Sequence, residues 1–180
     1  MIDVSVAYNR YKFLGHEFLT WLWYLIDNNP GVLKAADDQI ESLVIGNRIV
    51  LENSRHNREE TITIRGDGAG LEEGLLALRK GAKVTEIQLV YRSGELEWRF
   101  TIKGESLSLS GFKTPQTAAM ETLEDLEGAV LEKIYLIERV ISLVHKLYAA
   151  FIGDRVSTQW DRQTVRQISS WIGGEERRAP

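Results

Sequence analysis

Apolar residues recur in steps of three and four through the later part of the chain, between residues 116 and 152. This spacing aligns apolar side chains along one side of an α-helix. The segment contains no proline, its only glycine is Gly128, and its acidic residues come mostly before its basic ones, as the helix dipole favours. We therefore predict one long helix over residues 116–152, with an apolar stripe formed by Leu123, Leu126, Val130, Ile134, Ile137, Ile141, Val144, Tyr148 and Phe151.

Three shorter stretches share the helical spacing of apolar residues. The first covers residues 13–27, with the sequence FLGHEFLTWLWYLID, and Asn28 to Gly31 form a turn that ends it. Glycines close the other two stretches, as is typical of helix ends. We predict an N-terminal helix within residues 1–31, a short helix over 71–80, a final helix over 156–172 and a frayed, charged tail over 173–180.

Strand patterns fill the region between residues 39 and 111. Runs rich in β-branched and aromatic residues occupy 40–51, 61–65, 84–91, 96–102 and 106–111. In one run Trp98, Phe100 and Ile102 alternate with Glu97, Arg99, Thr101 and Lys103, which predicts one buried and one solvated face. The polar residues 52–60 are expected to form a loop, and Gly46-Asn47 leaves open a division of the first run into two short strands.

These patterns together predict a single α+β domain over residues 1–180. Short turns between the strands indicate an antiparallel meander over residues 39–111. We expect a sheet of about five strands, with the N-terminal helix, the long helix and the final shorter helix packed on it.

The composition restricts the chemistry that the chain can carry. A net charge of −4 argues against a uniformly basic nucleic-acid binder but is compatible with a local basic patch. The chain has no cysteine, which excludes disulfides, thiolate catalysis and cysteine-based metal centres, and fits a reducing compartment. No signal-peptide pattern opens the chain, and the apolar run at 18–26 is too short to span a bilayer. We therefore expect a cytoplasmic protein without membrane contact.

No catalytic or metal-binding motif is complete in this sequence. His16-Glu17 begins like the zinc-protease pattern, but Thr20 stands where that pattern requires its second histidine. The glycine-rich residues 66–70 lie between a strand and a helix, yet Leu71-Glu72 supplies no P-loop lysine. The histidines are scattered, and adjacent carboxylates diverge on both helices and strands. We expect no enzymatic activity, no cofactor and no bound metal.

Basic residues cluster locally along the chain. Arg162 and Arg166 lie four residues apart and so share one side of the final helix. If the clusters converge in the fold, they would form a surface that follows a phosphate backbone. The other interpretation of each cluster is ordinary solvated surface charge. The candidate DNA-binding residues are Arg55, Arg58, Lys80, Lys83, Arg155, Arg162 and Arg166.

Aromatic and aliphatic residues on the predicted helices belong either to the core or to a subunit interface. The first helix is apolar on more than one side, and the long helix has an apolar seam with coiled-coil spacing. Both features indicate a homo-oligomer, most simply a dimer. The candidate interface residues are Phe18, Trp21, Trp23, Ile141, Val144 and Tyr148.

The stretch Phe13–Trp23, FLGHEFLTWLW, is the most distinctive part of the sequence. It resembles the FLG-x-EFLTWLW stretch of short bacterial proteins grouped with the recombination-associated RdgC family, and RVSTQW at 155–160 is similar to their closing region. The resemblance implies a non-enzymatic, DNA-associated bacterial protein. Well-known members of that family bind duplex DNA with little sequence preference, close into a ring-shaped dimer and restrain loading of the recombinase filament.

Two functional hypotheses follow. The first is sequence-tolerant binding of duplex DNA connected with recombination, through phosphate contacts from arginine and lysine. The alternative is an oligomeric protein–protein interaction or adaptor module that does not touch nucleic acid, which the acidic net charge favours. The distribution of surface charge separates them, because DNA needs a continuous positive surface and an adaptor needs a broad apolar patch.

Overall fold

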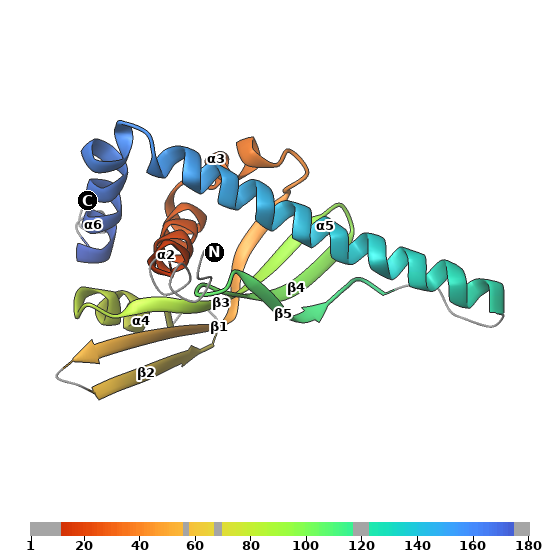
Figure 1. Ribbon diagram of the computed structural model, residues 1–180, viewed down its shortest axis with the longest axis horizontal. Coiled ribbons are helices and arrows are strands. Elements are labelled where there is room, and N and C mark those ends of the chain that lie inside the picture. Colours follow the sequence, from red (N-terminus) through yellow and green to blue (C-terminus); the bar gives the residue numbers. More distant parts are fainter. Residues whose placement is uncertain (1–11, 56–57, 67–69, 117–122, 175–180) are drawn as a thin grey trace, which may run out of the picture.

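The chain forms two layers, a β-sheet and a group of helices that all lie on the same side of it (Figure 1). The computed structural model describes residues 12–55, 58–66, 70–116 and 123–174. The predicted α+β class is confirmed, including a five-stranded antiparallel sheet, an N-terminal helix, a long late helix and a shorter final helix. The predicted tail over 173–180 lies mostly outside the described residues.

The sheet has the strand order β2-β1-β3-β4-β5, and every neighbouring pair is antiparallel. It is a meander only from β3 onward, because the chain leaves β2 at one edge, passes through helix α4 and returns beside β1. The strands are β1 (Ser42–Arg55), β2 (Arg58–Arg65), β3 (Lys83–Ser93), β4 (Leu96–Lys103) and β5 (Ser108–Lys113).

The predicted loop over residues 52–60 is wrong. Strand β1 continues to Arg55 and β2 begins at Arg58, so these two residues are paired at the end of a long hairpin. Gly46-Asn47 does not divide the first strand. It lies where the register between β1 and β3 shifts, between Ile45 and Ile49, so the extra residues are absorbed as a bulge.

Six helical elements complete the described structure. The long helix includes residues up to Arg155, three beyond the predicted end. Of its predicted start, Gln116 is not helical and residues 117–122 lie outside the described residues. The final helix begins later than predicted, as a π-helical turn that continues directly into an α-helix. The elements are α2 (Phe13–Asn28), α3 (Pro30–Ala36), α4 (Gly70–Arg79), α5 (Leu123–Arg155), η1 (Trp160–Thr164) and α6 (Val165–Gly173).

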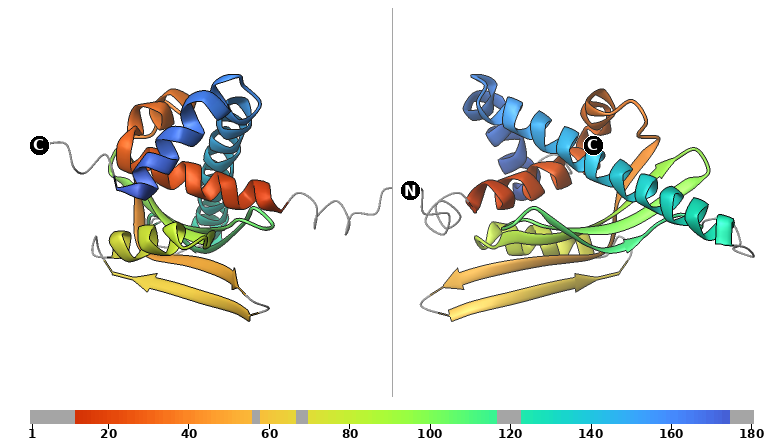
Figure 2. Two further views of the ribbon diagram at one scale, coloured as in Figure 1. Left: turned by 90° about the vertical axis from the view of Figure 1, so that its left-hand side faces the viewer. Right: turned by 45° about the vertical axis from the view of Figure 1, so that its right-hand side comes forward.

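Helix α2 lies inside the helical layer, between the sheet and the later helices (Figure 2). Phe18 packs against Tyr148 and Phe151 of α5, with ring centroids 5.2 and 5.6 Å apart. Trp23 meets Trp171 of α6 edge to face at 5.4 Å. The aromatic side chains that widen the apolar surface of α2 therefore fill the core of a single chain, because helices contact α2 on several sides.

This placement corrects most of the predicted subunit interface. Phe18, Trp21, Trp23 and Val144 are all buried within the chain, with at most 5% of their surface exposed, so they offer no contact area to a second subunit. Ile141 is the exception, since 39% of its surface is exposed. Tyr148 is half-buried against Phe18.

Two glycines bring α2 unusually close to the sheet. Gly15 lies on α2, and a Cβ atom built on it would overlap the carbonyl oxygen of Gly104, in the turn after β4. On the other side of the contact, a Cβ on Gly104 would come within 3.1 Å of the Gly15 oxygen. The absence of both side chains lets the two backbones touch.

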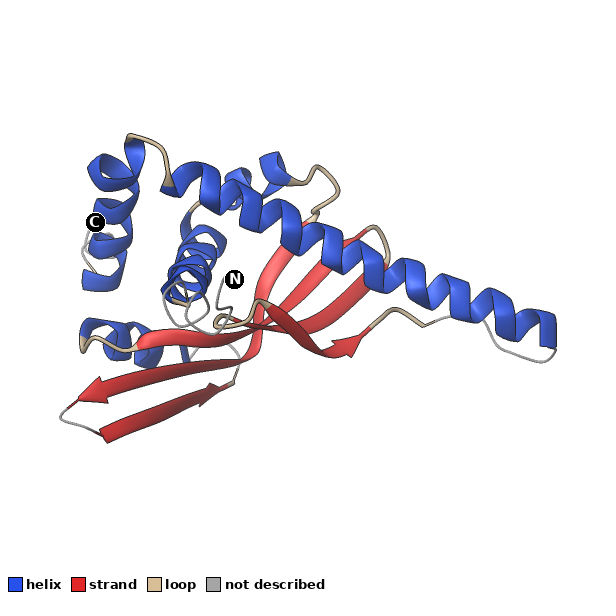
Figure 3. Ribbon diagram, in the orientation of Figure 1, coloured by secondary structure: helices blue, strands red, loops and turns tan. Residues whose placement is uncertain are grey.

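The two faces of the sheet have different surroundings (Figure 3). Alternate residues of each strand point toward the helices and form the core, among them Leu51, Ile64, Leu89 and Phe100. The residues between them point the other way, where no described helix covers the sheet. Among the described residues, no helix is both long and apolar enough to cross a membrane.

Candidate nucleic-acid interface

The uncovered side of the sheet carries most of the charged residues of the strands. The paired register assigns them to this side, because each is opposite another outward residue on the neighbouring strand. Lys83 is opposite Glu52 in the register but lines a pocket on the helical side, so it is not counted here. Among the other strand side chains that the structure describes, six basic and three acidic residues lie on this side. We call this surface the open sheet face and define it by Arg48, Glu52, Arg65, Glu86, Arg92, Glu97, Arg99, Lys103 and Lys113.

Two arginines lie directly opposite each other on this face. Arg48 of β1 pairs with Arg65 of β2 in the strand register, and like charges in that position destabilise a sheet. Together with Asn47 and Gly66 they line a hollow of about 420 Å³. The Nε atom of Arg48 is buried and has no hydrogen-bond partner among the described residues. An anion in this hollow would offset the repulsion and accept hydrogen bonds from both guanidinium groups.

Acidic residues offset only part of the positive charge. Glu86 bridges two basic residues, Arg48 at 3.2 Å and Lys103 at 3.9 Å. Glu97 does the same for Arg92 at 2.7 Å and Arg99 at 3.8 Å. Each of these carboxylates therefore holds two cations in place while neutralising one charge, which leaves a net positive surface that is ordered by its own ion pairs.

Two further cations are free to meet a ligand. Arg65 at one edge strand and Lys113 at the other are exposed, and neither forms an ion pair with any described residue. Lys113 is opposite Arg99 in the register of β4 and β5. Basic side chains therefore extend across the sheet from β2 to β5.

The aromatic residues of the described strands point away from this face. Tyr91 and Trp98 stack on each other in the core at 4.9 Å, and Phe100 and Phe112 do so at 6.1 Å. The open sheet face instead presents aliphatic and hydroxyl groups between its charges, such as Val44 and Thr63. It has the groups for contacting phosphates and lacks a platform for stacking bases.

The basic residues that the sequence suggests lie elsewhere. Lys80 follows α4, Arg162 is in η1 and Arg166 is in α6, all on the helical side of the sheet. Arg155 ends α5, where its guanidinium bonds to Glu17 at 2.8 Å and lies over the ring of Trp160 at 5.1 Å.

The other three are at the ends of strands. Arg55 and Arg58 are opposite each other at the end of the β1–β2 hairpin. Lys83 begins β3 and lines a pocket on the helical side. The fold therefore does not gather the predicted residues into one surface. Local clustering in the sequence missed the open sheet face, whose basic residues are distributed over five strands, with no more than two on any one strand.

The described residues show no second site with obvious catalytic chemistry. No group of three or more histidine, aspartate or glutamate side chains is placed to hold a metal ion within this part of the chain. The most buried carboxylate, Asp37, is engaged by Lys146 at 3.1 Å and by the backbone N–H of Gln39. Asp154 accepts hydrogen bonds from Trp21 and Thr164, so it links helices.

Comparison of the chain with protein-family models, with curated proteins and with solved structures finds no match. The resemblance of residues 13–23 to the RdgC-like proteins therefore stays a prediction from the sequence. In the structure those residues belong to helix α2, where most of them are buried. They stabilise the fold and form no part of the open sheet face.

Proposed function

We propose that this protein binds duplex DNA through the sugar-phosphate backbone, with little sequence preference, and that the open sheet face is the binding surface. The observation that carries the proposal is the segregation of charge. Six basic and three acidic residues share one uncovered face of a chain whose net charge is −4. The connection with recombination rests on the resemblance of residues 13–23 alone.

The chemistry of the face favours phosphate contacts over base recognition. Arginine offers a planar fork of donors that matches phosphate oxygens, and Arg48 and Arg65 present two such forks across one hollow. Contacts of this kind position a protein on DNA without reading its sequence. The absence of aromatic side chains among the described outward residues also disfavours single strands, whose binding usually depends on base stacking.

A titration of labelled duplexes tests this function. Fluorescence anisotropy with two duplexes of unrelated sequence should give the same affinity within a few-fold, and that affinity should fall about tenfold or more between 50 and 200 mM salt. Lack of binding to either duplex at the lower salt concentration would rule out the proposal.

A second candidate function, self-association, is favoured by exposed apolar residues of α5, whose first turns extend beyond the sheet (Figure 1). Val130, Ile134 and Ile141 lie on the seam with coiled-coil spacing, and between 39 and 51% of the surface of each is exposed. The next residues of the same seam, from Val144 onward, are covered by α2. We propose that a second copy of the chain covers the exposed part, since identical heptad seams are self-complementary.

The molecular mass in solution tests this second candidate. Sedimentation equilibrium should give the mass of a dimer for the wild-type chain and of a monomer for Ile134→Glu, because a charge in the seam would be buried without a partner. Glu132→Gln is the matched control, since Glu132 lies on the opposite side of α5 and its replacement should leave the dimer intact. A monomeric wild-type protein would exclude self-association through α5.

A further inference from the structure

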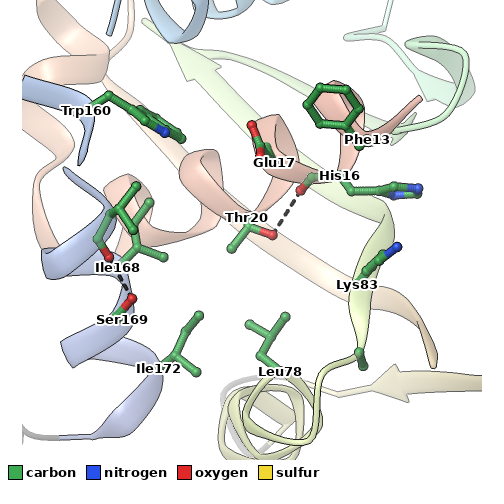
Figure 4. A pocket seen from close by; sticks show the side chains of 12 residues that line it. Phe13, His16, Glu17, Thr20, Leu78, Lys83, Trp160, Ile168, Ser169 and Ile172 are labelled. Atoms are coloured by element: carbon green, nitrogen blue, oxygen red, sulfur yellow. Dashed lines mark hydrogen bonds between the residues drawn. The ribbon is translucent and has the colours of Figure 1, made fainter. Parts of the chain in front are cut away.

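A pocket of about 370 Å³ opens on the helical side of the molecule, away from the open sheet face (Figure 4). Its walls come from α2, from η1 and α6, and from the end of α4 with the following residues up to the start of β3. Most of the lining is apolar and is provided by Phe13, Leu78, Trp160, Ile168 and Ile172. Pockets of this volume with apolar walls are typical of sites for small organic molecules.

The polar groups of the pocket are concentrated near the start of β3. The ring of His16 hydrogen-bonds through Nδ1 to the carbonyl oxygen of Val84 at 2.9 Å, which places it next to Lys83. Because a carbonyl only accepts, Nδ1 must carry the hydrogen, and Nε2 is left for another partner. Lys83 is exposed and forms no ion pair with any described residue.

The remaining polar side chains are already occupied. Glu17 is held by Arg155 at 2.8 Å, so its charge is compensated. Thr20 donates its hydroxyl hydrogen to the carbonyl oxygen of His16, and Ser169 donates to that of Val165 (Figure 4). The groups left to bind a ligand are therefore the ammonium of Lys83 and the ring of His16.

We propose that this pocket binds a medium-chain monocarboxylate. The aliphatic body of such a ligand would displace water from the apolar wall formed by Leu78, Ile168 and Ile172. Its carboxylate would accept hydrogen bonds from Lys83 and, when the imidazole is protonated, from His16. One cationic end on an otherwise apolar pocket selects a ligand with one anionic end. This inference does not depend on DNA binding.

Calorimetric titration with decanoate tests the proposal, with 1-decanol as the neutral analogue. Decanoate should bind the wild-type chain at one site, and Lys83→Gln should weaken it about tenfold or more, the usual effect of losing a charge-assisted hydrogen bond. Lys34→Gln is the matched control, since Lys34 is exposed on α3 and does not line the pocket, and it should bind like the wild type.

Two further variants separate the pocket from the exposed apolar seam of α5. Ser169→Trp fills the pocket from an exposed position and should abolish binding, whereas Ile134→Glu on the seam should leave it unchanged. Circular dichroism of each variant checks that it is folded. No binding of decanoate to the wild type, equal binding of decanol, an unchanged affinity in Lys83→Gln, or loss of binding in Ile134→Glu would each overturn the proposal.

Discussion

Trp98 joins the two layers of the molecule. It lies on β4, is fully buried, and donates its indole N–H to the carbonyl oxygen of Leu136 in α5 at 3.0 Å. Its ring stacks on Tyr91, and the guanidinium of Arg139 lies 6.0 Å from the ring centre. Arg139 in turn bonds to Tyr91 and Ser93 of β3. One side chain thus links the sheet to the middle of the long helix through packing and a hydrogen bond.

The hydrogen bond of Trp98 should contribute measurably to stability. Trp23 is a matched comparison, because it is equally buried but its indole N–H has no partner among the described residues. Both Trp→Phe changes remove the same volume, and only Trp98→Phe removes a hydrogen bond. We expect Trp98→Phe to lower the free energy of unfolding by about 1 kcal/mol more than Trp23→Phe does. Urea denaturation of both variants measures the difference, and equal losses would show that the bond contributes nothing.

Burial also changes the titration of Tyr148. Desolvation raises the pKa of its hydroxyl above the ordinary value of 10.0, because the charged phenolate is poorly solvated inside the chain. Above pH 10 the unfolded chain therefore loses this proton before the folded chain does, and stability falls as the pH rises. Tyr148→Phe should make the decline of unfolding free energy above pH 10 shallower than in the wild type. An identical slope in the two proteins would contradict this.

At the scale of elements, periodicity is enough to predict most helices and strands. The alternation of Trp98, Phe100 and Ile102 marks a strand with one buried face, and the structure confirms it. The same signal fails for residues 52–60, because much of that hairpin lies beyond the helices and has few apolar residues to bury. Hydrophobic alternation reports burial, so a strand solvated on both faces leaves no such pattern.

The candidate site is harder to predict for a related reason. Arg48 and Arg65 are cross-strand neighbours in the sheet, yet many residues separate them in the sequence. Their juxtaposition depends on the hairpin, and that of Arg48 with Glu86 depends on the return of β3 beside β1 after α4. A search for local clusters of basic residues therefore favours Arg162 and Arg166, which are close in sequence.

Two helical glycines differ in the space around them, so replacing each with alanine should have opposite effects on stability. Gly15→Ala would push a methyl group into the backbone at Gly104, and we expect it to destabilise the fold by about 3 kcal/mol, as overpacking does. Gly128→Ala on the exposed part of α5 meets nothing within 4 Å, so it should stabilise the helix by about 0.5–1 kcal/mol. Thermal unfolding of the two variants distinguishes these effects. A stabilising Gly15→Ala would mean that α2 lies farther from the sheet.

At the scale of the whole molecule, the main feature is the separation of charge between the two layers. The open sheet face is positive although the chain as a whole has a net charge of −4. The residues outside this face therefore have a more negative net charge than the whole chain. A negative helical layer would repel DNA, which leaves one orientation for the duplex. The exposed seam of α5 lies in the helical layer, so dimerisation there leaves the open sheet face accessible.

The most direct test of the open sheet face as a DNA-binding surface is the salt dependence of duplex binding in two double variants. Replacing both Arg48 and Arg65 with glutamine should weaken binding and reduce the slope of log affinity against log salt concentration by about 2, one for each lost phosphate contact. The matched variant replaces Arg162 and Arg166 with glutamine and should keep the wild-type slope. If the Arg162 and Arg166 variant loses affinity while the Arg48 and Arg65 variant binds like the wild type, the open sheet face is not the DNA-binding surface.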